Sequence, residues 1–476
     1  MINSQTEKPR AFDRMGKLCS KFFLNRYFYL FLFCAACAVS VLEWEVYGAI
    51  AFVALICLTL VLCDDIMASA LPLLLLCVFV TNCYDSADTF MKFAWMAIPA
   101  AAAIIFHFVA YRKKLVIGSS IWGLIAVSAA LTLGGIGVLS FSEYFSPVAI
   151  YYTVFLGIGM VGLYFLLKSQ LSAPRDYDVK EKAVLLLYIM GIFAAFVVLY
   201  NVLPDTRFMG GLKISTSFQA SNNLSTILMF AMPCAFFYAR RSKLHLLVAL
   251  LMAVAMVLSG SRAGMLFAPI ELLLCVIVSA VFDKKNRFYY VCLIIFAAVT
   301  VALFREKLYS YIVAANPPTI DDSEARIRLI ARAKELFKKY PVFGHGLAYT
   351  GNFDIYSPKK GAMGWYHMMI PQVVASMGSV GIIAYVYQMV VQVSAGVNSM
   401  RRAAGDENER ALIITLGLSY VGALMMSQVN PGIFCPIPYG LMATVIFALM
   451  DGDRGMEKVG AYVRRLKSKK AKKEEN

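Results

Sequence analysis

Two arginines and one histidine are the residues of this sequence whose types and placement best suit chemistry on a phosphorylated substrate. Arg262 lies in a run of serine, glycine and alanine between two apolar segments, Arg326 lies in a long polar segment, and His367 follows Trp365 and Tyr366. A guanidinium keeps its charge and donates paired hydrogen bonds to phosphate. A histidine titrates near neutrality, so it can carry a proton or pair with phosphate. The alternative interpretations are an arginine that extends toward the membrane surface and a histidine in an interfacial aromatic belt.

The polar segment 305–367 is far longer than a connection between two helices requires. Within it, apolar residues recur at helical spacing from Ser323, a suitable N-cap, to about Tyr340, and Pro341 ends the pattern. The other face of this predicted helix is basic and carries Arg326, Arg328, Arg332, Lys334, Lys338 and Lys339. Such a helix could rest on anionic headgroups. It could also form a basic lid over a polyanionic lipid, and both interpretations stay open.

The elements that must position these residues are apolar segments long enough to cross a bilayer. Of the 476 residues, 60% are hydrophobic and 16% are charged, and the mean hydropathy is +0.69. A spanning segment needs roughly 20 apolar residues and must satisfy its backbone internally as a helix. We therefore predict an all-α, polytopic integral membrane protein with about 12 to 14 transmembrane helices and a helical extracytoplasmic loop. The predicted spans are 27–42, 46–62, 67–82, 90–110, 115–140, 147–167, 183–203, 222–239, 244–260, 263–282, 288–304, 368–397, 411–428 and 434–450.

The net charge of +16 is distributed unevenly along the chain, which predicts the orientation. With the N-terminus inside, 31 of the 45 Lys and Arg residues fall in cytoplasmic segments, and short outer loops hold four. This asymmetry indicates a cytoplasmic (inner) membrane protein with both termini cytoplasmic. It also favours anionic membrane lipids over nucleic acid as the partner of the basic tail. The predicted regions are a basic N-terminus (1–26), a helical bundle (27–304), the extracytoplasmic loop with its amphipathic helix (305–367), further transmembrane helices (368–450) and a basic tail (451–476).

Several short motifs in the second half of the chain follow one another in a specific order. Asn222-Asn223 opens a helix, Ser261-Arg262 lies at a helix junction, and Arg326 precedes Tyr340-Pro341-Val342-Phe343-Gly344-His345-Gly346. His367 then heads a helix that contains Gly378-Ser379-Val380-Gly381. This order, over about residues 200–390, resembles the O-antigen ligase and O-antigen polymerase superfamily. The chain has Met368 where the family commonly has asparagine, and Ser376 where it often has an acidic residue.

The resemblance implies a GT-C-like glycosyltransferase of bacteria that acts at the outer face of the cytoplasmic membrane. It implies metal-independent transfer or polymerisation of a glycan from an undecaprenyl diphosphate donor onto a glycan or glycolipid acceptor. The loop lacks a carboxylate cluster for a divalent ion, so fixed cations are the available means of stabilising the departing diphosphate. We expect no metal or cofactor.

In this interpretation Arg262 and Arg326 bind the diphosphate, and His367 assists its departure or accepts the acceptor hydroxyl's proton. These three are the expected catalytic residues, and the further candidates for substrate binding are Arg328, Arg332, His345 and Asn223. Ligase and polymerase activity remain equally compatible with the sequence.

Two other classes of function stay open. A flippase or exporter of lipid-linked oligosaccharide would also have many helices, but its charges would line a path through the bilayer. A non-enzymatic scaffold for envelope assembly is the other alternative. The basic residues of this chain gather outside the apolar segments, which favours the transferase.

Overall fold

The computed structural model describes residues 11–79, 95–111, 116–137, 149–150, 153–171, 177–202, 221–315, 320–347, 366–429 and 437–451. Within these ranges every regular element is a helix, which confirms the all-α prediction. The helices are α1 (Ala11–Phe23), α2 (Arg26–Val41), α3 (Glu45–Leu62), α4 (Met67–Phe79), α6 (Ala97–Ala110), α7 (Ile121–Ala130), α9 (Met160–Leu171), α10 (Val179–Val202), α11 (Ser221–Ala239), α12 (Leu244–Leu258), α13 (Arg262–Phe282), α14 (Arg287–Ala315), α15 (Ile320–Lys339), α16 (Met369–Arg402), α17 (Glu407–Ser427) and α18 (Ile437–Met450). Two π-helical segments, η1 (Leu131–Gly135) and η4 (Val154–Gly159), adjoin α7 and α9, and a 3-10 turn, η6 (Lys284–Asn286), precedes α14.

The lengths and apolar character of these helices make the chain a polytopic membrane protein. Among the described residues, five helices can cross a bilayer by length and composition, namely α3, α10, α13, α16 and α17. The pair formed by α1 and α2, bent by 58°, makes a sixth if it is one span. Further apolar helices of 10 to 17 residues include α4, α6 and α12. The predicted total of 12 to 14 spans stays a prediction.

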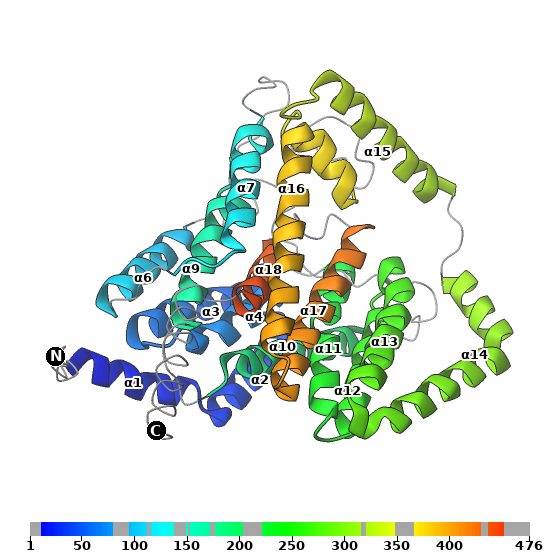
Figure 1. Ribbon diagram of the computed structural model, residues 1–476, viewed down its shortest axis with the longest axis horizontal. Coiled ribbons are helices and arrows are strands. Elements are labelled where there is room, and N and C mark those ends of the chain that lie inside the picture. Colours follow the sequence, from blue (N-terminus) through cyan, green and yellow to red (C-terminus); the bar gives the residue numbers. More distant parts are fainter. Residues whose placement is uncertain are drawn as a thin grey trace, which may run out of the picture.

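Helix α11 lies at the centre of the larger packing cluster. Nearly all of its side chains are buried, and it packs against α10, α12, α13 and α17. A helix that is apolar on every side is stable only when neighbours cover its whole surface. A second cluster combines residues of α16 on both sides of Gly378 with α7, α9 and α18. Figure 1 shows α14 leading away from the bundle and α15 returning across one end of it to the start of α16. We call this the α15 end.

Helices α14 and α15 differ in extent from the predicted elements. The span predicted to stop at residue 304 continues as α14 to Ala315, and α15 begins at Ile320, so the predicted cap Ser323 lies within the helix. The sequence between residues 305 and 315 is rich in good helix formers, and nothing in it forces a stop. Helix α15 ends at Lys339, before Pro341, as predicted. The basic tail after Asp451 lies outside the described residues.

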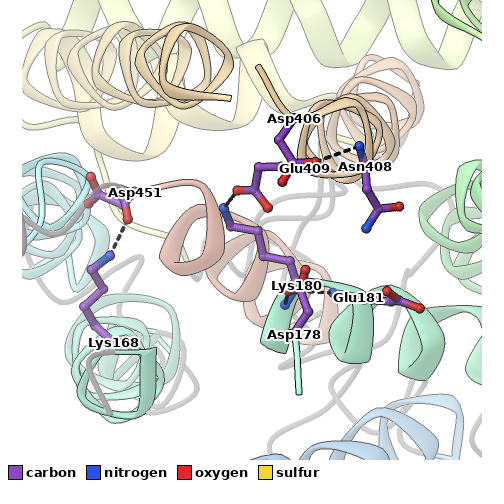
Figure 2. A network of polar contacts seen from close by, with 8 residues as sticks. All are labelled: Lys168, Asp178, Lys180, Glu181, Asp406, Asn408, Glu409 and Asp451. Atoms are coloured by element: carbon purple, nitrogen blue, oxygen red, sulfur yellow. Dashed lines mark hydrogen bonds and ion pairs between the residues drawn. The ribbon is translucent and has the colours of Figure 1, made fainter. Parts of the chain in front are cut away.

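Ion pairs and helix caps join the elements at the end of the bundle opposite α15 (Figure 2). Lys180 of α10 pairs with Glu409 of α17. Arg241, in the turn after α11, donates to the carboxylate of Glu181 at 2.7 Å. Asp406 caps α17 by accepting the backbone N–H groups of residues 408 and 409 at 2.9 and 3.0 Å. The starts of α10 and α17 and the end of α11 therefore lie together, as alternating spans require.

The carboxylate of Asp451 fixes the end of α18 to the start of α7. It accepts the backbone N–H of Ser119 (2.9 Å) and of Ser120 (2.6 Å), and the hydroxyl of Tyr164 (2.6 Å). Lys168 donates to the Asp451 carbonyl (Figure 2). Burial opposes ionisation, but these hydrogen bonds outweigh it and lower the pKa of Asp451. We interpret this cluster as structural.

Candidate functional site

Arg262 is the first residue of α13, and the residues beside it hold that helix end against α11. The hydroxyl of Ser261 accepts the backbone N–H of Gly264 at 3.0 Å, which is an N-cap, and donates to Asn222 Oδ1 at 2.6 Å. Ser261 is fully buried, whereas Arg262 is exposed. The positive end of the helix dipole and a guanidinium therefore occupy the same helix terminus, an arrangement that suits an anion.

Close contact between α11 and α13 explains the small residues around Arg262. A Cβ atom at Gly264 would lie 2.5 Å from the Ser225 hydroxyl of α11 and 2.9 Å from the Met256 carbonyl oxygen of α12. The Ser225 hydroxyl also bonds Ser259 at 2.9 Å. Asn223, one residue after Asn222, is only 2% exposed. Asn223 thus lies behind the exposed surface that carries Arg262.

The apolar face of the basic helix α15 packs against the start of α16. Leu329, Ala333 and Leu336 form a small buried cluster with Tyr366 and Ala375. Burial of these side chains stabilises the contact by the usual hydrophobic effect. The basic residues of α15 therefore remain on its outer faces, at the α15 end of the bundle.

The three arginines of α15 have different surroundings. Arg326 is partly buried, and its Nη2 donates to the carbonyl of Val429, just beyond α17, at 3.4 Å. Arg332, 30% exposed, pairs with Glu335 at 2.7 Å. Arg328, 73% exposed, pairs with Glu324 at 2.8 Å within the same helix. Arg326 thereby joins α15 to the end of α17, which itself packs against α11 and α13.

A break in α16 places the residues after His367. Gly378 has φ 59° and ψ −151°, which separates a short first part of the helix from a long second part. These angles belong to a region that is open almost only to glycine. Figure 1 shows the short part, in yellow, at a steep angle to the long part, in orange.

The segment Pro341–Leu347, which we call the strap, satisfies the backbone on both sides of this break. Its N–H groups donate to the last carbonyls of the short part, and its carbonyls accept the first N–H groups of the long part. The four hydrogen bonds, donor first, are His345 to Ala375 (3.0 Å), Gly346 to Ser376 (3.0 Å), Ser379 to Pro341 (2.9 Å) and Val380 to Val342 (3.1 Å). Helix ends need such partners when they are buried. The shape of the break therefore depends on the strap.

His345 lies inside the protein as part of the strap. Its side chain is fully buried, and its Nε2 lies 3.1 Å from the hydroxyl of Tyr366. Burial, together with the nearby charge of Arg332, lowers the pKa of His345 to about 4. The imidazole is therefore neutral at physiological pH and does not supply positive charge to an anion.

His367 connects Tyr366 to the start of α16 with a left-handed backbone, φ 51°. This conformation is uncommon for a residue other than glycine and has to be imposed by its surroundings. The side chain is partly exposed, in contrast to the fully buried Tyr366. His367 is thus a partly exposed side chain next to a fully buried tyrosine.

The structure groups the predicted site residues into two sets at the α15 end. Asn223 and Arg262 belong to the α11–α13 junction, whereas His345 and His367 belong to the strap and the start of α16. Helix α15 links the sets, because its arginines lie on a helix that contacts both α16 and the end of α17. Gln372 and Ser376, which bond one another beside His367, were not predicted. Their signal in the sequence was the placement of polar side chains in an otherwise apolar helix.

The fold and the site together define a polytopic membrane protein whose basic helix covers one end of an all-helical bundle. Residues 247–386 match the model of the O-antigen ligase family, so the chain carries an O-antigen ligase domain. The predicted resemblance is thereby confirmed, and the matched segment includes Arg262, Arg326, His345 and His367. The family implies an enzyme of the O-antigen ligase or polymerase type. No curated protein matches the chain.

Proposed function

We propose that this protein transfers or polymerises a glycan from an undecaprenyl diphosphate donor onto a glycan or glycolipid acceptor, without a metal ion. The observation that carries the proposal is the placement of two guanidinium groups beside the ends of two helices that pack together. Arg262 begins α13, and Arg326 contacts the residue that follows α17. Helices α13 and α17 are neighbours, so both cations serve the same end of the bundle.

In the proposed reaction, an acceptor hydroxyl attacks the anomeric carbon of the donor sugar. The bond between that carbon and the diphosphate oxygen breaks, and negative charge grows on the leaving diphosphate. Arg262, Arg326 and the N-terminus of α13 stabilise this charge in the transition state. The hydroxyl proton passes to His367; alternatively, His367 donates a proton to the diphosphate as it leaves and the hydroxyl proton passes to water. Either role requires a partly exposed imidazole, and His367 is partly exposed.

The second group of predicted binding residues differs in how each could act. Arg332 and Arg328 have exposed surface and can touch the substrate. His345 and Asn223 are buried and would act from behind the site, by holding the strap and the α11–α13 junction. We propose that the α15 end faces the outside of the bacterial cytoplasmic membrane, with both termini cytoplasmic and anionic lipids around the basic segments.

One observation favours a transporter instead, namely the fully buried carboxyl group of Glu271 within α13. An acidic residue inside a span is expensive and often functional. Its surroundings are apolar or weakly polar, with Gly422 against the carboxyl and Cys234 and Cys275 nearby. A path for an ionic substrate needs successive polar groups, so we retain the transferase as the proposal.

The proposal is tested by replacing Arg262, Arg326 and His367 one at a time by alanine. Each variant should lose glycan transfer by about 10²–10³-fold, since each removes a preorganised charge or proton carrier. Arg262→Lys should restore activity only in part, because an ammonium lacks the planar paired donors of a guanidinium. Lys338→Ala is the control, since Lys338 is an exposed cation of the same region.

The assay compares ligated or polymerised glycan with the lipid-linked precursor in cells that express each variant at equal membrane levels. Wild-type glycan in both the Arg262→Ala and the His367→Ala strains would refute the proposed site.

A further inference from the structure

A chain of buried side-chain hydrogen bonds surrounds the start of α16. The Oε1 atom of Gln372 accepts the backbone N–H of Tyr366 at 3.0 Å, and its Nε2 donates to Ser376 Oγ at 3.0 Å. The Tyr366 hydroxyl in turn lies 3.1 Å from His345 Nε2. All four side chains are fully buried. Buried polar groups that bond one another favour one geometry, because a displacement breaks one of these bonds where no water replaces it.

Gln372 holds the residues on both sides of His367. Its side-chain oxygen binds the N–H of Tyr366, and its own backbone N–H donates to the carbonyl of Met368 at 3.2 Å. Met368 is the N-cap of α16, but its side chain makes no cap hydrogen bond. The bond to Met368 is the ordinary first bond of the helix, whereas the bond to Tyr366 is made by the Gln372 side chain, which reaches back from the first turn of α16.

The backbone of His367 has a left-handed conformation that these hydrogen bonds support. A left-handed conformation is strained for a residue other than glycine, so it persists only where the neighbours determine it. Both neighbours of His367 are bound to Gln372, and the ring of Tyr366 is anchored on His345. The backbone conformation of His367 is thus supported by the side chains of Gln372, Tyr366 and His345, which are fully buried.

We propose that Gln372 is a positioning residue for His367: its side chain fixes the backbone that precedes the histidine and so aims the imidazole at the substrate. This inference rests on the proposed function of His367. Gln372 itself is fully buried, so it acts through the histidine and touches no substrate.

The test uses Gln372→Met, which keeps the length of the side chain and removes both of its hydrogen bonds. Displacement of a catalytic group by about 1 Å costs up to about 10²-fold, so kcat should fall by roughly that factor while the KM for donor changes little. Gln372→Glu keeps the acceptor for the Tyr366 N–H and can accept the Ser376 hydroxyl, so it should recover much of kcat. A displaced imidazole should also change the pH profile of kcat.

Gln392→Met is the matched control. Gln392 lies on the same helix, is 5% exposed, and accepts the Tyr420 hydroxyl at 2.8 Å. Its replacement also removes a buried hydrogen bond, but far along α16 from His367. The two methionine variants should lose similar thermal stability, and only Gln372→Met should lose kcat.

The assay uses the full-length protein in nanodiscs, with undecaprenyl diphosphate-linked oligosaccharide from a deletion strain as donor and the membrane glycans of that strain as acceptor. An unchanged kcat in Gln372→Met, or a rise in KM alone, overturns the inference. If Gln372→Met does not fold, Ser376→Ala is the deciding variant, because it removes one of the two hydrogen bonds of the Gln372 side chain. A lower kcat in Ser376→Ala supports the inference, and a wild-type kcat overturns it. Full activity of His367→Ala would instead refute the proposed function, so the two failures are distinguishable.

Discussion

Replacement of Gly378 by alanine should disrupt the candidate site without touching any proposed catalytic residue. Gly378 forms the break in α16, where φ is 59° and ψ is −151°. A Cβ atom there would lie 2.6 Å from the carbonyl oxygen of Val342 and 2.8 Å from the backbone nitrogen of Gly344. Both atoms belong to the strap, so the clash cannot be relieved by rotating a side chain. The strap or the first part of α16 must move.

The size of the effect follows from these contacts. The backbone strain of a residue other than glycine in this region costs about 1–3 kcal/mol. Moving the strap also weakens its backbone hydrogen bonds to residues on both sides of the break, at about 1 kcal/mol each. We therefore expect Gly378→Ala to lower the free energy of unfolding by roughly 2–5 kcal/mol. Transfer should be lost as well, because the same strap carries His345, which anchors Tyr366 next to His367.

Thermal unfolding of the purified protein and glycan transfer in cells together check this prediction. Gly396→Ala is the control on the same helix, because a Cβ atom at Gly396 meets nothing within 4 Å. Alanine favours a helix over glycine by about 1 kcal/mol, so this variant should be neutral or more stable. Wild-type unfolding and transfer in Gly378→Ala would refute the account of the strap as the partner of both helix parts.

Three further predictions concern acid stability, orientation and metal. Folding lowers the pKa of His345 from 6.5 to about 4. Between pH 6.5 and about pH 4, the His345 imidazole is therefore protonated in the unfolded chain but not in the folded protein. Stability should therefore decrease by up to roughly 3 kcal/mol as pH falls through this window, and His345→Gln should flatten the slope measured by chemical unfolding. Reporter fusions at Lys338 should read extracytoplasmic and those at Lys182 and Lys285 cytoplasmic; a cytoplasmic signal at Lys338 would contradict both the orientation and the chemistry. Transfer by purified protein should survive excess EDTA, and strict dependence on magnesium or manganese would show that the site has been misread.

Local properties of the sequence determined the class of this protein and the limits of several elements. Apolar segments that alternate with short basic turns predicted a polytopic helical bundle, because hydrocarbon tolerates little else. The starts of α11 and α16 and the stop before Pro341 followed from residue types at those points. The order of Ser261-Arg262, the glycine-rich strap and His367 was sufficient to predict the O-antigen ligase domain. The roles proposed for Arg262, Arg326 and His367 remain predictions.

Only the tertiary structure decided how the second half of the chain is held in place. The sequence predicted a turn at Gly344-His345-Gly346, but not that its backbone would cap both sides of a break more than thirty residues later. Likewise, no periodic pattern in the sequence indicates that His345 is buried or that Gln372 bonds the residue before His367. Hydrogen bonds between distant segments depend on which backbone groups folding leaves without a local partner. That is a property of the packed chain, whereas helix formation and membrane insertion depend on the local sequence.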